Sequence, residues 1–425
     1  MCRHEGKSGE AVSTERNARN FVLDNSTSTV AYWICSGTVI AGLTSYFGMP
    51  LSVSNLITGF TSTLPMLQLF GGIWYARARK KNLFVCGWSV AWRLCLPLIF
   101  FVVLLPKNIG SVVMAVSYLL AASVFQLVTP AQTDWMVTAT EGHVKSNYYA
   151  MREMFFSLAY SGGFCAASLL IFYSQRTGTQ QLGFLIIGIL ISTLMIVSVV
   201  ILTRLPPPKQ TAPVCRSVRQ IMTSPLKNAP FRRILWMMAA WNFFCMFLGG
   251  FSSVYQIRIL KLDFFHIMIW TTVASLLRAL LAPAIAKVAA RFGWRSVTAV
   301  CMAVVAGTGL LWMVTTSQNV TLMYPVIIIL GTIPYAGLNV GFLQFQVDNM
   351  PEGERNIYFS VSATFNGIAA LLGSAGCSAL IQFLENMWGF STLGLRYIFG
   401  IGALGIAATA LSCLKISEKK PENRR

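Results

Sequence analysis

The sequence predicts an all-α membrane protein with twelve transmembrane helices in two related bundles of six. Three observations lead to this fold class: the apolar composition, the distribution of positive charge, and an internal repeat. Of 425 residues, 55% are apolar and 11% are charged, whereas about 25% are charged in soluble domains. The apolar runs are long and continuous, which indicates helices, because strands of a membrane barrel would alternate apolar and polar residues.

A spanning helix needs about 20 mainly apolar residues. Pro130, Pro325 and Pro334 fall inside two of the stretches that meet this requirement, and membrane helices tolerate them where neighbouring groups satisfy the freed backbone. The polar segment 1–28 predicts no cleaved signal peptide, since no apolar core follows its basic residues. The predicted spans are 29–48, 53–76, 83–105, 110–133, 150–173, 182–203, 234–256, 264–286, 296–316, 322–346, 358–384 and 395–414.

Positive charge predicts the orientation of the chain. Of the 33 Lys and Arg residues, 26 fall in the two terminal segments and the connections after even-numbered spans. Only five fall in the other connections, and Arg93 and Arg278 lie within spans. Cytoplasmic connections of membrane proteins carry the excess of Lys and Arg. Both termini are therefore expected in the cytoplasm, and the net charge of +19 needs no nucleic-acid partner.

The longest connection, 204–233, divides the chain. Pro206, Pro207 and Pro208 end the preceding helix. Val214, Val218, Ile221 and Met222 then follow helical spacing among arginines, which fits a short helix on the inner membrane surface; a disordered linker is the alternative. The predicted segments are an N-terminal tail, a first half, this linker, a second half and a C-terminal tail: 1–28, 29–203, 204–233, 234–414 and 415–425.

The two halves repeat each other at an offset of 214 residues. Ala76-Arg77 after span 2 recurs as Ala290-Arg291 after span 8, each with a basic residue a few positions on. Gln132-Thr-Asp134-Trp-Met136 recurs as Gln346-Val-Asp348-Asn-Met350. Several matches in one register indicate a duplicated six-helix unit, and repeats of this size are a transporter architecture.

With these features the chain resembles the major facilitator superfamily over nearly its whole length. The family motif after spans 2 and 8 usually reads G-x-L-a-D-R-x-G-R-K. Here Ala76 and Ala290 stand in place of its Asp, and Arg79 replaces the second Gly of the first copy. The resemblance implies alternating access around a cavity lined mainly by spans 1, 4, 7 and 10. It also implies a cytoplasmic gate from which the usual Asp is missing.

Arg93 and Arg278 are the first candidates for substrate binding, since a charge within a membrane span is costly and functional by default. They would bind an anionic group of the substrate; the alternative is hydrogen bonding to nearby carbonyls or snorkelling. Polar and aromatic residues on the expected cavity helices are further candidates, each with packing as the alternative: Tyr32, Trp33, Gln126, Gln132, Trp241, Asn242, Tyr335, Asn339 and Gln344.

No acidic residue is expected near the middle of a span, and Asp24 falls in the predicted tail. The repeated Asp134 and Asp348 are predicted to replace the missing motif Asp by pairing with basic residues at the cytoplasmic face; static capping is the alternative. The gating candidates are thus Arg77, Arg79, Asp134, Arg152, Arg291 and Asp348, and the coupling candidates are Asp134, Glu153 and Asp348.

The predicted function is secondary active transport of a small organic solute, with a lean towards a polar or anionic metabolite. No nucleotide-binding loop of the GxxxxGK[ST] kind is present, and no enzyme activity, cofactor or metal is predicted. A proton or sodium ion would couple transport, unless the protein is a uniporter. We expect a monomer in the bilayer of a bacterial inner membrane. A multidrug exporter, a solute sensor and a membrane-embedded enzyme are the alternatives.

Overall fold

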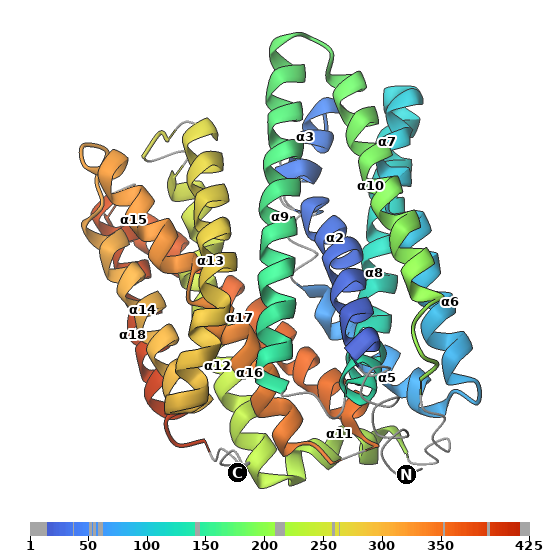
Figure 1. The fold of residues 1–425 in the computed structure, drawn as a ribbon. Coiled ribbons are helices and arrows are strands. Elements are labelled where there is room, and N and C mark those ends of the chain that lie inside the picture. Colours follow the sequence, from blue (N-terminus) through green and yellow to red (C-terminus); the bar gives the residue numbers. More distant parts are fainter. Residues whose placement is uncertain are drawn as a thin grey trace, which may run out of the picture. The chain divides into compact units, whose positions relative to one another are not determined.

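A computed structural model describes residues 15–416, except 37, 51–52, 54–56, 58–62, 141–144, 209–216, 257–259, 263, 352 and 389–391. In this part of the chain every regular element is a helix (Figure 1), which confirms the all-α fold class. The helices form two compact units. The first comprises Met1–Ile221 with Glu352–Val361, and the second comprises Met222–Pro351 with Ser362–Arg425.

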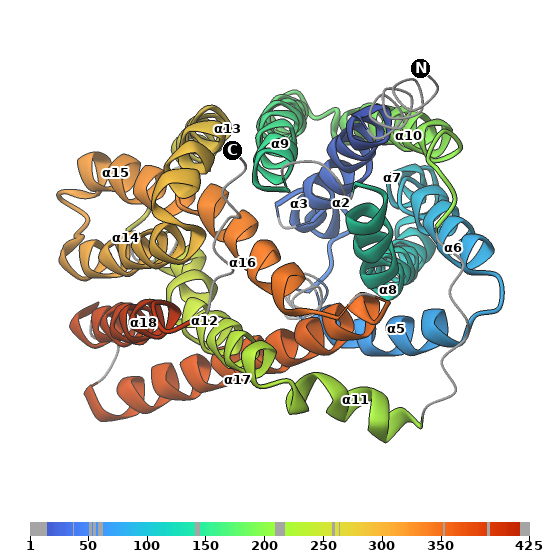
Figure 2. The ribbon, with the colours of Figure 1, turned by 60° about the horizontal axis from the view of Figure 1, so that its bottom comes forward.

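The first unit surrounds the N-terminal helix. Residues 15–24 are helical and continue without interruption into the next two elements. Figures 1 and 2 show α9 and α10 beside α2, and α5 and α6 pack against α8. The elements are η1 (Asn25–Thr29), α2 (Val30–Ile34), α3 (Thr38–Tyr46), η2 (Leu64–Leu67), α5 (Gln68–Arg77), α6 (Lys81–Cys95), α7 (Leu98–Phe101), η3 (Val102–Leu104), α8 (Lys107–Ala139), α9 (Lys145–Arg176) and α10 (Gln180–Leu202).

The second unit is built on α18, which packs against α12 and α14. An aromatic cluster of Tyr255, Trp312, Tyr324 and Phe399 fills part of its core. The elements are α12 (Ala229–Val254), α13 (Phe264–Phe292), α14 (Trp294–Val314), α15 (Val320–Thr332), α16 (Tyr335–Asn349), α17 (Arg355–Trp388) and α18 (Thr392–Cys413). Of α17, the part up to Val361 belongs to the first unit.

Nine helical stretches of the described chain are long and apolar enough to cross a membrane. Pro130 lies inside the continuous helix α8, whereas Pro334 separates α15 from α16 within one such stretch. Part of the predicted span 53–76 lies outside the described residues. The count of twelve therefore stays a prediction.

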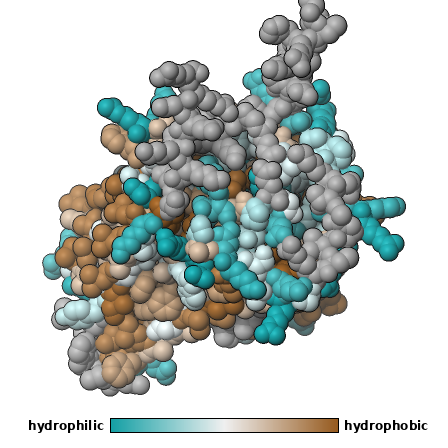
Figure 3. All heavy atoms as spheres, turned by 90° about the horizontal axis from the view of Figure 1, so that it is seen from below, coloured by the Kyte–Doolittle hydropathy of each residue, from teal (hydrophilic) through white to brown (hydrophobic). Residues whose placement is uncertain are grey.

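Large apolar side chains cover the outside of the helices. Leu322 is 77% exposed and Leu404 is 71% exposed, and many similar residues accompany them. Monomeric soluble proteins rarely expose wide apolar surfaces, so these side chains fit contact with lipid. Hydrophilic residues gather instead on the face that Figure 3 shows, beside apolar residues at its margin.

The first helix starts earlier than the apolar pattern predicts. Asp24, which the sequence analysis leaves in the N-terminal tail, lies well inside it, nine residues after its first described residue. The helix breaks after Ile34, where Cys35 and Ser36 form a turn, and α3 follows. The polar residues of 15–29 hide this helix from a hydropathy window, although the side chains of Phe21, Val22 and Ser28 are buried.

The connection between the units contains a short helix, α11 (Val218–Lys227). Ser217 and Gln220 form a reciprocal cap. The backbone N–H of Gln220 donates to Ser217 Oγ at 3.3 Å, and the backbone N–H of Ser217 donates to Gln220 Oε1 at 3.1 Å. At the other end, Arg232 donates to the carbonyl of Leu226 at 3.2 Å. The helical interpretation of this part of the linker is confirmed, while 209–216 lies outside the described residues.

Candidate functional site

The first helix has a π-helical turn, η1, at its most polar stretch, Asn25-Ser-Thr-Ser-Thr29. A π turn leaves carbonyl groups without their α-helical partners, and it often marks a functional site. Here side-chain hydroxyl groups donate hydrogen bonds to backbone carbonyl groups. The hydroxyl of Ser28 donates to the backbone carbonyl of Asp24 at 2.7 Å, and the hydroxyl of Thr27 donates to the backbone carbonyl of Leu23 at 2.9 Å. The hydroxyl groups of this stretch thus bind carbonyl groups of the turn before it.

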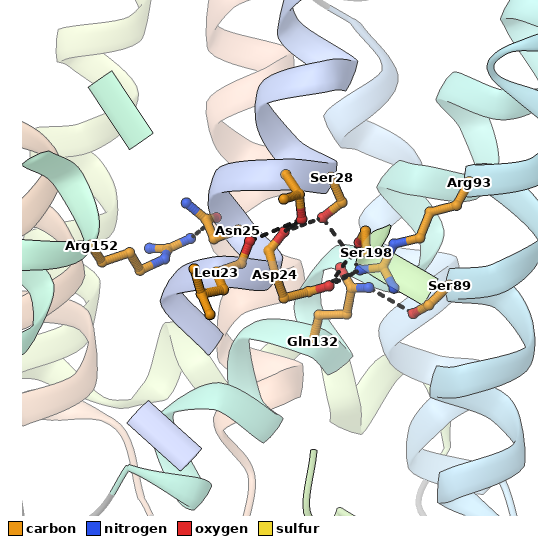
Figure 4. A network of polar contacts seen from close by, with 10 residues as sticks. Leu23, Asp24, Asn25, Ser28, Ser89, Arg93, Gln132, Arg152 and Ser198 are labelled. Carbon is orange, nitrogen blue, oxygen red and sulfur yellow. Dashed lines mark hydrogen bonds and ion pairs between the residues drawn. The ribbon is translucent and has the colours of Figure 1, made fainter. Parts of the chain in front are cut away.

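The turn presents Asp24 to Arg93 of α6 (Figure 4). Nη2 of Arg93 donates to both carboxylate oxygens of Asp24 at 2.9 Å, and Ser198 of α10 donates to Oδ1 at 2.9 Å. The Arg93 side chain is fully buried, and that of Asp24 is 14% exposed. A buried charge is tolerated only when it is paired, so the Arg93 guanidinium requires Asp24. The same contacts join the first helix to α6 and α10.

A pocket opens beside this ion pair, within the first unit. Its volume is about 110 Å³, well below the roughly 300 Å³ at which drug-sized pockets begin. Most of its lining residues are polar, with four aromatic and Met side chains among them, and they come from the first helix, α8 and α9. The lining residues are Phe21, Asp24, Asn25, Ser28, Thr29, Phe125, Thr129, Gln132, Thr133, Trp135, Met136 and Arg152.

Arg152 of α9 gives this pocket its net charge. Its Nη2 donates to Oδ1 of Asn25, a neutral amide, at 2.7 Å. In the described part of the chain Arg152 forms no ion pair, and the carboxylate of Asp24 is already neutralised by Arg93. Arg152 was predicted as a gating residue. The geometry places its guanidinium against a polar pocket, where it could receive an anionic group.

The other predicted residues of this unit have different surroundings. Gln132 lies in the pocket and donates to Ser89 of α6 at 2.6 Å. Gln126 is buried and accepts a hydrogen bond from Gln68 at 2.7 Å. Tyr32, only 2% exposed, stacks on the pocket residue Phe125 with 4.1 Å between the ring centroids. Trp33, in contrast, is 48% exposed.

In the second unit, three of the predicted residues come together. The guanidinium of Arg278 lies over the ring of Tyr335, 5.9 Å from its centroid. The ring of Trp241, which is buried, meets that of Tyr335 edge-on at 6.2 Å. These residues come from α13, α16 and α12. They form a cation–aromatic cluster, to which cation–π attraction contributes.

Three other candidates of this unit have different neighbours. Asn242 donates to the carbonyl of Met238 in its own helix at 2.8 Å. Gln344 donates to the carboxylate of Asp348, also at 2.8 Å. Asn339 has an exposed side chain.

The predicted gating residues are distributed over both units. In the first unit Asp134 interacts electrostatically with Lys81 and with Tyr75, and Lys81 lies over the Tyr75 ring at 5.0 Å. Lys81 is thus a basic neighbour of Asp134 that the repeat did not suggest. Glu153 lies near Ser157, whose hydroxyl is 3.4 Å from its carboxylate. Arg77, Arg79 and Arg291 have exposed side chains, and pairing across the cytoplasmic face stays a prediction.

Sequence reasoning missed Asp24, Asn25 and Ser198. Their signals are weak: a run of hydroxyl residues beside an acid, and one serine in the very apolar helix α10. A pattern does not show that Asp24 and Ser198 meet at Arg93, since 174 residues separate them along the chain.

The fold and site define a class: a multi-pass helical membrane protein with charged and polar groups buried inside its helix bundles. The sequence model of the Major Facilitator Superfamily matches residues 26–374. The chain therefore belongs to this superfamily, whose members are transporters, and it is a membrane transporter rather than an enzyme. No curated protein matches it in sequence.

Solved structures with the same fold cover nearly the whole chain. A bacterial homologue of the iron transporter ferroportin, with soaked iron, has a TM-score of 0.70 at 14% identity, over 96% of this chain and 99% of that one. The human organic anion transporter MFSD10 has a TM-score of 0.68 at 12% identity, over 94% and 99%. The proton:xylose symporter XylE has a TM-score of 0.64 at 10% identity, over 95% of each chain.

Proposed function

We propose that the protein is a secondary active transporter that carries a small polar or anionic organic solute across a bacterial inner membrane. The two six-helix halves would give access to each side in turn, with both termini in the cytoplasm. One observation carries the choice of solute: a pocket of about 110 Å³ holds the guanidinium of Arg152 among hydroxyl and amide groups. A carboxylate there would gain charge-assisted hydrogen bonds.

Arg278 supports the same solute class from the second unit, because it places another guanidinium over the ring of Tyr335, which Trp241 meets edge-on. Arg93 supports it less, because its Nη2 already binds both carboxylate oxygens of Asp24 and its charge is compensated there. Asp134, Glu153 and Asp348 stay the coupling candidates, and Asp24 joins them because it is an acid that lines the pocket from inside a helix. Sodium coupling and uniport are the alternatives.

A multidrug exporter is the competing function. Phe21, Phe125, Trp135 and Met136 in the pocket wall favour it, since aromatic and Met side chains bind amphipathic compounds. The small volume and the guanidinium favour the polar solute. The two functions therefore differ in which compounds stabilise the purified protein.

A thermal-shift screen of the full-length protein in detergent tests the proposal. The panel includes organic carboxylates, sugars, ferrous iron and lipophilic cations. A compound at 100 times its dissociation constant adds about 2.7 kcal/mol to the stability. We expect organic anions to give this shift and to be taken up by proteoliposomes. Stabilisation by lipophilic cations alone would replace the proposal with the exporter.

Arg152→Gln is the variant that tests the site. It retains a donor towards Asn25 but loses the charge, so uptake of the stabilising anion should fall at least tenfold, the factor for about 1.4 kcal/mol. Arg176→Gln is the matched control, because this exposed arginine ends the same helix, α9, at its other end. Equal uptake by the Arg152→Gln variant and the wild type would remove Arg152 from the site.

A further inference from the structure

Helix α11 has three kinds of surface around its axis. Ile221 is 1% exposed, while Val218 and Met222, four residues apart, are 42% and 39% exposed. Successive residues turn by about 100° around a helix. On that geometry Val218 and Met222 lie between buried Ile221 on one side and exposed Arg219 on the other. The order around the helix is therefore buried, exposed apolar and basic.

The position of α11 in the chain places it at an end of the membrane-spanning helices. It follows α10, a candidate span, and α12 begins two residues after Lys227. Arg232 and Arg233 at the start of α12 are exposed, and Arg232 holds the last turn of α11 through the carbonyl of Leu226. The basic side of α11 thus continues into further positive charge.

A helix of ten residues has little stability in water by itself. The cap at Ser217 and Gln220 supports one end, but the apolar pair Val218 and Met222 gains nothing while it faces water. At a bilayer surface this pair would enter the boundary between headgroups and acyl chains, and the basic residues would meet phosphate groups. An anionic surface attracts such residues over about a Debye length.

We propose that α11 is a docking surface for the headgroups of anionic phospholipids, with Val218 and Met222 inserted below them and Arg219 and Lys227 bound to their phosphates. The buried side of the helix then faces the protein, the apolar pair faces the acyl chains, and the basic side faces the headgroups. The inference concerns the bilayer and is independent of which solute is transported.

Hydrogen exchange of the full-length protein in lipid nanodiscs tests this surface. The amides of 217–227 are compared in nanodiscs of phosphatidylcholine alone and of phosphatidylcholine with phosphatidylglycerol. We expect at least tenfold greater protection in the anionic nanodiscs, and its loss in 1 M salt, where the Debye length is about 3 Å.

The variants separate charge from insertion. Each basic residue near an anionic surface contributes roughly fivefold, so the pair accounts for up to about 25-fold, and Arg219→Gln with Lys227→Gln should remove the gain in protection that the anionic lipid gives. Val218→Ser with Met222→Ser should lower it as well, while Arg176→Gln, the control, should leave it unchanged. Equal protection in the two lipids would overturn the proposal. Equal protection in a nonionic detergent without lipid would also overturn it, because no anionic headgroup would then be needed.

Discussion

Asp24→Asn is expected to destabilise the protein by about 3–5 kcal/mol, the cost of removing one partner from a buried ion pair. The substitution keeps the size of the side chain and an oxygen for the hydroxyl of Ser198. It removes the negative charge, and Arg93, whose side chain is fully buried, then has no compensating charge at this contact. Thermal unfolding in detergent measures the loss.

A double variant makes this prediction specific. Replacing a buried ion pair by apolar residues of similar volume is often neutral or stabilising. Asp24→Leu with Arg93→Met should therefore recover most of the stability that Asp24→Asn loses. If the double variant is less stable than the Asp24→Asn variant, the charge of Arg93 is compensated by something other than Asp24.

Gly71→Ala should cost about 3 kcal/mol, at the upper end of the range for overpacking a tight interface. Gly71 of α5 packs on α8 so closely that a Cβ would meet the carbonyl oxygen of Leu127 below contact distance, and would lie 2.6 Å from its carbon. Backbone cannot rotate away as a side chain can, so the two helices would have to separate. Small residues allow such close approach of helices in membranes.

Gly87→Ala is the matched control, because a Cβ at Gly87 of α6 meets nothing within 4 Å. Alanine is the better helix former by roughly 0.5–1 kcal/mol, so this variant should be neutral or slightly more stable. The two variants are compared by unfolding in the same detergent. A loss of less than about 1 kcal/mol for Gly71→Ala would mean that α5 and α8 can move apart easily.

The sequence predicts the fold well because one physical requirement dominates it. Long apolar runs must become helices in lipid, where backbone groups have no water to bind. The all-α class and the helical part of the linker at Val218–Lys227 follow from such patterns. The start of the first helix does not, because Asn20, Asp24, Asn25 and Ser28 make it polar even though it packs inside the first unit.

The candidate site was predictable only in part. Arg93 and Arg278 are conspicuous in sequence because each is a charge among apolar residues. What each guanidinium faces depends on contacts between distant segments: Arg93 meets Asp24 across 69 positions, and Arg152 meets Asn25 across 127. A single sequence shows composition and period along the chain, but not these pairings.

The π turn also sets an angular relation along the first helix. One residue turns an α-helix by about 100°, so the wide turn at Asn25–Thr29 fixes how far the segment after it is rotated relative to the segment before it. Before the turn, Asp24 points to Arg93; after it, Tyr32 lies on Phe125. Deleting one residue from 25–29 would restore a regular helix, and only one of these two side chains would then still face its partner. The turn thus sets the angle between the two segments of the helix, so that the helix presents a charge to one neighbour and an aromatic ring to another.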